Sequence, residues 1–556
     1  MKRLPDRPNI GHLKKQAKDL LALYREGDAS AFARFRAALP IAANADNRTI
    51  ASLDLRLHDA QSCVAREHGF ASWAELKSFV AAREAQSSDP AATALTLMRL
   101  IYAGDIAGGM NRARPAVAAR LLEASPEIAG KDPYLACAVG DVAALREELR
   151  RDAAWKDRPG GALGLPPLVA VTHSSLLRLP AYRERLMAAA RLLLDAGADP
   201  GQSVQSRWAA SPKAPSKEYP LSALYGAAGQ NRDPELTQLL LERGANPNDG
   251  ESLYHALESP ACTRLLLKAG ARVTGTNALY RALDLDDAEP LRLLLAHGGD
   301  PNERPPGAPT SAWGSPLLWA IRRRRSAEHV RALLAAGADP SARTPEGNSA
   351  YVLALKFGLP HVAELVREAG GSVSGLSEQE EFVAACTRGD EPAARRLLAE
   401  RPGSLAALSA SELRLLPELA AQDAGETVRL MVRLGWPVAT RGGDWDASAL
   451  NHAVFRGDSR LARFLLDHGA SWREQHGFGD NVCGTLSWAS CNEPVEGGDW
   501  PGCAEALVAH GLPAAHPGPQ GSGVVVMEGT SRRFSEDVAD VLLAAVPQVA
   551  PEGGGG

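Results

Sequence analysis

One short motif recurs along this 556-residue chain. It reads LLLDAGADP at residues 192–200 and returns as LLLERGANP at 239–247, LLLAHGGDP at 293–301 and ALLAAGADP at 332–340. A leucine-rich run closed by glycine is typical of a helix that ends in a left-handed residue, and Asp/Asn-Pro is typical of the turn that follows. The motif therefore predicts a repeated structural unit. It makes Asp199, Asn246, Asp300 and Asp339 turn residues and not catalytic acids.

A second pattern lies about 20 residues before most copies of the motif. A serine or asparagine opens it, as in SALYGAAGQN at Ser222, and Leu and Ala then recur at helical spacing. Each unit is therefore predicted to be a helix, a tight turn and a second helix that ends in LLL. We expect Leu240 and Leu294, in the second helices, to pack between neighbouring units. The other openings are at Ser252, Asn277, Ser315, Ser349 and Ser448.

The two patterns together resemble the ankyrin repeat. The best copy is ADPSARTPEGNSAYVLALKFGLPHVAELVREAGG at 338–371, and the resemblance covers roughly residues 130–515. It implies an all-α ankyrin-repeat solenoid of about nine to eleven stacked helix-turn-helix units. It also implies a non-catalytic scaffold that binds a protein partner through its concave face and finger loops. The units near Gly270 and Gly298 are short, and inserts precede Gly244 and Gly337.

The outer segments differ from the repeats. Residues 1–82 read as a helical module: one face of 9–25 is apolar, and Ser72 with Glu75 forms a predicted capping box. The pair HLKKQAKDLL and AREHGFASW resembles a module found ahead of bacterial ankyrin-repeat proteins. We expect a linker and helical N-cap region at 83–130, the repeats at 131–515, and a C-terminal capping helix with a disordered PEGGGG tail at 516–556.

Residues that vary around the motif are the predicted binding residues. In the ankyrin pattern, two residues at the end of each first helix face the concave groove. Here they form a basic and aromatic strip, which implies a protein partner with an acidic or phosphorylated segment; a solvated helix end is the alternative for the IRRRRS run. The predicted strip contains Arg322, Arg323, Lys356, Phe357, Arg388, Phe455 and Arg456.

Three tryptophans lie in the predicted inserts and fingers, namely Trp208, Trp313 and Trp445. A finger-tip tryptophan either packs on its own neighbours or anchors a partner, and inserts on one face of a repeat array are often its binding face. All three are therefore included among the predicted partner-binding residues.

Two alternative functions were weighed against the scaffold. A cluster of cysteines and histidines lies in the last units, but their spacing lacks the short CxxC pairs of zinc sites, and GPQGSGVVV lacks the lysine of a phosphate loop. We therefore predict no catalytic, cofactor-binding or metal-binding residue, with a cryptic enzyme or metal site in 470–530 as one alternative. The cluster consists of His468, His476, Cys483, Cys491, Cys503 and His510.

The other alternative is a nucleic-acid-associated regulator that acts through Lys14, Lys15 and Lys18 of the N-terminal module. The chain has a net charge of -5 and so lacks the overall positive charge typical of nucleic-acid-binding proteins. No nucleic acid is therefore expected as a partner. Seven scattered cysteines indicate a reducing compartment. No apolar leader or membrane-spanning run is present, so we expect a cytoplasmic monomer without membrane contact.

Overall fold

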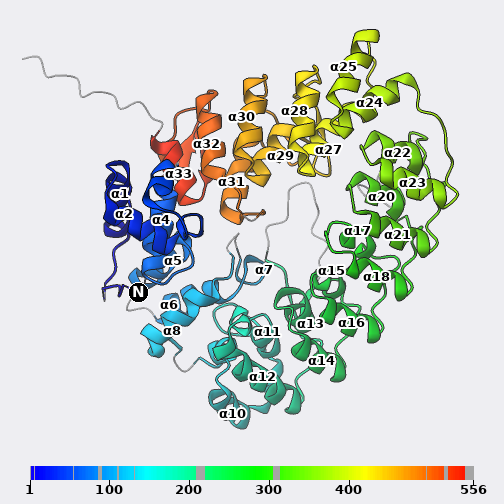
Figure 1. Cartoon of the computed structure of the whole chain (residues 1–556). Helices are drawn as coiled ribbons and strands as arrows, with labels where there is room; N and C mark the ends of the chain where they lie inside the picture. Colours follow the sequence, from blue (N-terminus) through cyan, green and yellow to red (C-terminus); the bar gives the residue numbers. More distant parts are fainter. Residues whose placement is uncertain are drawn as a thin grey trace, which may run out of the picture. The chain divides into compact units, whose positions relative to one another are not determined.

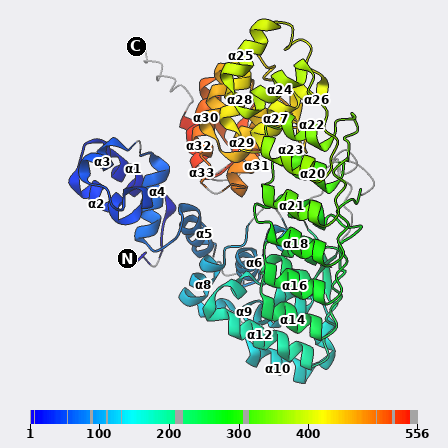
Figure 2. The ribbon, with the colours of Figure 1, turned by 45° about the vertical axis from the view of Figure 1, so that its right-hand side comes forward.

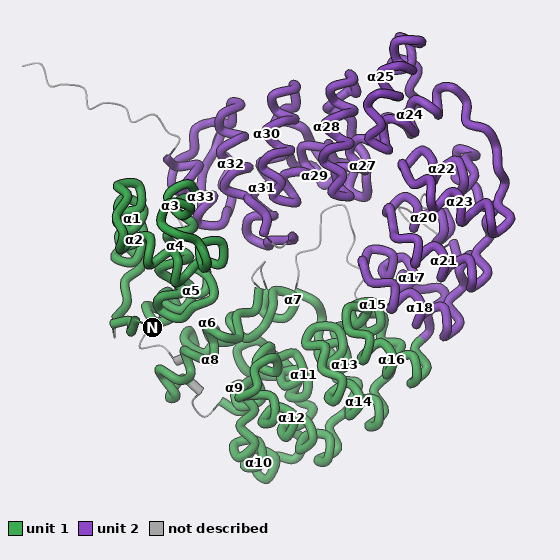
Figure 3. The backbone as a smooth tube through the Cα atoms, viewed as in Figure 1, with its two compact units in different colours: residues 1–210, 215–271 green, residues 211–214, 272–556 purple. Residues whose placement is uncertain are grey.

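The computed structural model describes residues 2–5, 7–53, 55–85, 90–108, 112–129, 132–207, 220–304, 314–495, 497–518 and 524–544. Most of these residues are in helices, and the few strands are short, as an all-α prediction requires (Figure 1). The described residues form two compact units, unit 1 up to Ala271 and unit 2 from Arg272 (Figure 3). This division lies inside the range 131–515 that the sequence predicts as one array.

Unit 1 begins with the helices of the predicted N-terminal module. They are α1 (Ile10–Arg25), α2 (Ala29–Ala38), η1 (Pro40–Ala42), α3 (Asn47–Ser52), α4 (Leu57–Glu67) and α5 (Trp73–Glu84). The predicted linker region contains α6 (Pro90–Ile101), α7 (Gly104–Ala107), α8 (Pro115–Ala124) and η2 (Pro126–Ala129). The rest of unit 1 consists of α9 (Pro133–Val139), α10 (Val142–Arg151), η3 (Ala153–Asp157), α11 (Pro167–Thr172), η4 (Ser175–Arg178), α12 (Pro180–Asp195), β1 (Ser203–Gln205), β2 (Pro220–Ser222), α13 (Ala223–Tyr225), η5 (Gly226–Gln230), α14 (Pro234–Glu242), α15 (Ser252–Ala256) and α16 (Pro260–Lys268).

Unit 2 continues the same alternation of short and longer helices. It contains α17 (Ala278–Ala282), α18 (Glu289–Ala296), α20 (Pro316–Arg322), α21 (Ala327–Ala335), α22 (Ala350–Lys356), α23 (Pro360–Glu368), α24 (Glu378–Arg388), α25 (Glu391–Glu400), α26 (Ala410–Leu413), α27 (Leu415–Ala421), α28 (Gly425–Arg433), α29 (Ala449–Arg456), α30 (Ser459–Asp467), α31 (Val482–Asn492), α32 (Trp500–Ala509) and α33 (Glu536–Ala544). Its strands are β3 (Arg441–Gly442), β4 (Ala447–Ser448), β5 (His516–Pro517), β6 (Val524–Met527) and β7 (Thr530–Arg533).

Within each unit, the first helices of neighbouring pairs pack against one another, and so do the second helices. In unit 1, α12 contacts α14 and α14 contacts α16, and Figure 2 shows these three second helices in one row. In unit 2, α18, α21 and α23 form such a row. The first helices α17, α20 and α22 also contact one another in sequence order. Leu240 and Leu294 are fully buried. The hydrophobic effect of stacking one apolar face on the next is therefore the main source of stability in each unit.

The local chemistry of the motif agrees with the prediction. All four turn residues accept a hydrogen bond from the backbone N–H two residues later: Asp199 from Gly201, Asn246 from Asn248, Asp300 from Asn302 and Asp339 from Ser341. The glycine that follows a second helix has a positive φ in the four full motifs and in five weaker copies of the motif. These positions are Gly197, Gly244, Gly270, Gly298, Gly337, Gly370, Gly435, Gly469 and Gly511.

The predicted N-caps are confirmed at some first helices and not at others. Ser222, Ser349 and Ser448 each accept a hydrogen bond from the backbone N–H three residues later. Asn277 and Ser315 occupy the cap position without such a bond. Ser252 does not occupy the cap position, since it is the first helical residue of α15. Its backbone N–H donates to the Asp249 carboxylate, three residues earlier.

The N-terminal helix also follows the prediction. Its buried side chains are those expected on one face, namely Leu13, Ala17, Leu20, Leu21 and Tyr24, while Lys15 and Lys18 are exposed. Half of the predicted capping box forms: Ser72 accepts from the N–H of Glu75, but the Glu75 carboxylate accepts from the N–H of Ala71. The predicted C-terminal helix is present as α33, and the PEGGGG tail lies outside the described residues.

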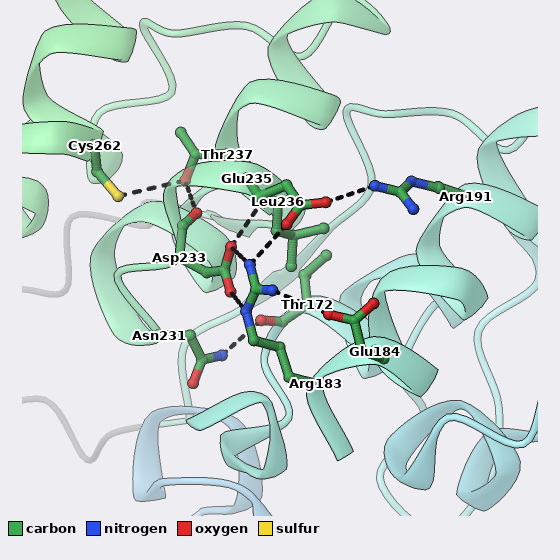
Figure 4. Close-up of polar contacts among 10 residues, drawn as sticks. All are labelled: Thr172, Arg183, Glu184, Arg191, Asn231, Asp233, Glu235, Leu236, Thr237 and Cys262. Atoms are coloured by element: carbon green, nitrogen blue, oxygen red, sulfur yellow. Dashed lines mark hydrogen bonds and ion pairs between the residues drawn. The ribbon is translucent and has the colours of Figure 1, made fainter. Parts of the chain in front are cut away.

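Charged side chains add a polar link between stacked pairs in unit 1 (Figure 4). Arg183 of α12 donates to both oxygens of Asp233, at 2.8 and 3.1 Å, and to Glu235 at 3.0 Å. Asp233 is also the N-cap of α14, where it accepts from the N–H of Leu236. A bidentate arginine on a capping carboxylate fixes both the distance and the orientation between two helices. The start of α14 is thereby held against α12.

None of the described helices combines the length and the apolar character needed to cross a membrane. The seven cysteines are all free.

Candidate binding face in unit 2

The described residues of the predicted strip all belong to unit 2. Arg322, Lys356, Arg388 and Arg456 each end a first helix, in α20, α22, α24 and α29, while Phe455 precedes Arg456 within α29. Arg323 and Phe357 follow α20 and α22 directly. Trp208 and Trp313 lie outside the described residues.

Every basic residue of the predicted strip is paired with a carboxylate. Arg323 Nη2 lies 3.0 Å from Asp284 Oδ1 and 2.5 Å from Asp444 Oδ2. The other pairs are Arg322 with Glu418 at 3.7 Å, Lys356 with Glu412 at 3.0 Å, Arg388 with Asp390 at 3.8 Å and Arg456 with Asp423 at 3.1 Å. Burial raises the pKa of the Asp284 and Glu418 carboxyls. The strip is thus a set of ion pairs, and all of them except Arg388–Asp390 join elements distant in sequence.

Part of the predicted strip is inside the protein. Lys356 and Phe357 are both buried, and with Arg322, Thr344 and Glu418 they help to line a cavity of about 30 Å³. A space of that size holds one or two water molecules. Lys356 and Phe357 therefore contribute to the core of unit 2, and their sequence positions at the end of a first helix do not make them surface residues.

A group of aromatic side chains remains partly exposed in the C-terminal half of unit 2. Phe455 and Trp488 stack with centroids 5.5 Å apart and planes 9° apart. Trp445 lies 5.7 Å from the Phe455 ring. Phe478 follows, with 56% of its surface exposed. We call Trp445, Phe455, Phe478 and Trp488 the aromatic face.

Two buried histidines support the aromatic face from below. His452 packs edge-on against Trp445 with centroids 4.8 Å apart, and His476 does the same at 5.2 Å. His476 also contacts Phe478, with centroids 5.9 Å apart. The partly exposed rings are therefore held by packing before any ligand arrives, which lowers the entropic cost of binding. Trp445 does pack on its own neighbours, as one of the two predictions for it requires.

Two finger loops hold Trp445 and Phe478 of the aromatic face. The β3–β4 pair presents Trp445 at its turn, with Arg441 opposite Ser448 and Gly442 opposite Ala447. Phe478 is at the tip of a second tight loop, in which His476 N–H donates to Asp480 O and Gly479 has a φ of 84°. The loops are joined because Gly477 N–H donates to Trp445 O at 2.8 Å. A Cβ on Gly477 would lie 2.7 Å from that oxygen, so this close approach requires glycine.

Sequence reasoning missed Trp488 and Phe478, although both leave a signal. Trp488 is seven residues after the N-cap Asn481, as Phe455 is seven residues after Ser448. Applying the same register to one more helix identifies it. Phe478 stands between two glycines in GFG, in a finger equivalent to the one that carries Trp445.

Burial gives His452 a strongly lowered pKa of about 4, against its ordinary value of 6.5. A lowered histidine pKa adds stability above pH 6.5 that is lost as the pH falls toward the folded-state pKa. From about pH 7 to about pH 5 we expect His452 to remove about 2 kcal/mol from the free energy of unfolding. Urea unfolding at both pH values should show a correspondingly smaller loss in His452→Asn. Equal losses in wild type and variant would contradict this assignment.

The residues of the two alternatives are also placed by the structure. Burial raises the pKa of the Cys483 thiol to about 12 and raises that of Cys503 as well. His510 pairs with Asp467, and the His468 ring contacts the Phe464 carbonyl. Within the described ranges, no three His, Cys, Asp or Glu side chains are arranged to hold a metal ion.

Comparison of the sequence with models of known protein families gives no match, and comparison with curated proteins gives none either.

Proposed function

We propose that this chain is an ankyrin-repeat protein that acts as a non-catalytic scaffold and binds a protein partner through the aromatic face. Three observations support the repeat assignment: helix pairs recur, second helices end in left-handed glycines, and equivalent helices contact one another in rows. The ankyrin resemblance supplies the family name and the expectation of protein binding. The family assignment and the binding activity are both part of the proposal.

The single observation that carries the binding function is the exposure of rigidly held aromatic rings. Trp445, Phe455 and Trp488 are partly exposed, although an aromatic ring gains most by full burial. Aromatic side chains dominate the energy of protein interfaces. Since the rings form one continuous contact series supported by buried histidines, they offer a preformed anchor for a partner.

Charge reversal of Arg322 and Arg323, two residues of the predicted strip, is a poor test of this function. Both guanidinium groups are bound to carboxylates within unit 2, so reversal places like charges together and destabilises the unit itself. A change at an exposed ring avoids that problem.

The sharper test is a photo-crosslinking residue at position 478. Val373 is the matched control because its side chain is also 56% exposed in unit 2, while it lies outside the aromatic face. Benzoylphenylalanine at 478, in cells that produce the protein, is expected to give a discrete adduct with a second protein. The same residue at 373 should not give that adduct. With the purified partner, Trp488→Ala should weaken binding by about 2 kcal/mol. Identical adducts from both positions, or none, would refute the proposal.

A further inference from the structure

Three ion pairs border the aromatic face, and in each the acid is the more exposed member. Asp444 and Asp446 flank Trp445 in the sequence, and Arg456, which follows Phe455, pairs with Asp423. Side-chain exposure is 38% for Asp444 against 20% for its partner Arg323, and 59% for Asp446 against 40% for Arg441. For Asp423 it is 71% against 24% for Arg456. In each of these pairs the carboxylate side chain is therefore the more accessible to solvent.

In these contacts the carboxylates also outnumber the guanidinium groups. Arg323 is shared by two carboxylates, those of Asp284 and Asp444. Asp423 and Asp446 both have a positive φ, 61° and 47°, which places them on tight turns. Asp and Asn are among the few non-glycine residues that adopt this conformation readily. Two of the three border carboxylates, those of Asp423 and Asp446, are thus held on turns of the backbone.

We propose that the aromatic face binds a basic protein segment, one whose arginine or lysine side chains lie on the rings and reach the carboxylates of Asp423, Asp444 and Asp446. This inference rests on the proposed function, because it names the chemistry of the partner at the same face. A guanidinium or ammonium group gains from the π face of Trp and Phe and from nearby carboxylates at once. Such a partner is complementary to the charge that the protein shows to solvent.

An acidic or phosphorylated segment is the less favoured partner at this face. To bind Arg323 or Arg456, its anions must compete with Asp444 or Asp423, which already pair with those guanidinium groups and are more exposed than they are. A basic segment faces no such competition, since it meets exposed carboxylates first. The proposed partner is thus opposite in charge to the one expected from the sequence.

The experiment uses full-length protein and a phage-displayed library of random peptides as the probe. Selections are run in parallel on wild type and on Trp488→Ala, and peptides that depend on Trp488 are sequenced. Enriched peptides are expected to carry net positive charge. Circular dichroism and thermal unfolding establish that the variant is folded.

A pair of charge variants gives the second arm. Asp423→Asn with Asp444→Asn removes two carboxylates from the border, and asparagine keeps the positive φ at 423 available. The control, Glu364→Gln with Glu426→Gln, removes two exposed carboxylates that also pair with arginines, on α23 and α28. We expect the affinity for a synthetic enriched peptide to fall about tenfold in the first double variant and to stay unchanged in the second.

The outcomes separate this inference from the function on which it rests. Acidic peptides that depend on Trp488 would overturn the basic partner and leave the binding face intact. Cationic peptides that bind both double variants equally would also overturn it, because the border carboxylates would then play no part. If no peptide depends on Trp488, both the inference and the proposed function fail.

Discussion

Leu240→Asp is expected to lower the free energy of unfolding by about 4 kcal/mol or more, enough to unfold unit 1 locally. Leu240 is fully buried in α14, which contacts both α12 and α16. The substitution removes a buried leucine side chain and places a carboxylate at a position that is fully shielded from solvent. Since each pair is stabilised by its neighbours, the loss extends to the interfaces with α12 and α16.

Urea unfolding followed by circular dichroism measures this effect. Gln238→Asp is the matched control because it introduces the same charge two residues away, on the exposed side of α14. The control should change the free energy of unfolding by about 0.5 kcal/mol or less. Leu294→Asp tests the equivalent buried position of α18 in unit 2. If Leu240→Asp and Gln238→Asp unfold at the same urea concentration, the stacking assignment is wrong.

The second large effect concerns a glycine that the recurring motif does not include. Gly457 closes the first helix α29 with a φ of 71°, and a Cβ there would lie 2.6 Å from the Cα of Gly498. Its carbonyl also accepts the N–H of Asp499, the N-cap of α32. We expect Gly457→Ala to cost about 3 kcal/mol, the sum of a left-handed alanine and a backbone displaced from its neighbour.

Gly469, from the motif itself, is the matched comparison. It has a φ of 93°, and a Cβ there would meet nothing within 4 Å. Gly469→Ala is therefore expected to cost only the left-handed conformation, about 1 kcal/mol. Both variants lie in the same part of unit 2 and are compared by urea unfolding. Equal losses would show that the approach of Gly457 to Gly498 does not constrain the packing of the next pair.

Glycines inside and outside the recurring motif are constrained in different ways. The motif glycines recur because every second helix ends in the same left-handed exit, and at most of them an added Cβ meets open space. They are constrained by local conformation alone. Gly457 and Gly358, which end first helices, are constrained by the backbone of the following pair as well. A repeated pattern therefore identifies positions of shared local geometry and does not rank them by packing.

Much of the fold was predictable because its determinants are local. Helical spacing predicted the apolar face of α1. Turn chemistry predicted that the Asp or Asn of each of the four complete motifs is a turn residue, and each accepts a backbone hydrogen bond there. Of the candidate site, the sequence identified Phe455 and Arg456 from the register of the first helices, which repeats from pair to pair. It identified Trp445 separately, from its place in a predicted finger.

The charge of that surface could not be read from the same register. Arg323, Arg322 and Arg456 are basic in the sequence, but their partners come from segments tens of residues away, such as Asp284 and Asp444 for Arg323. Whether an arginine is free or neutralised depends on which distant carboxylate the packing brings within hydrogen-bonding reach. The sequence by itself determined the helix pairs, their caps and their turns, because those interactions join residues a few positions apart. Only the tertiary structure decided that Asp423, Asp444 and Asp446 are the more exposed members of their ion pairs, because burial depends on the stacking of separate helix pairs.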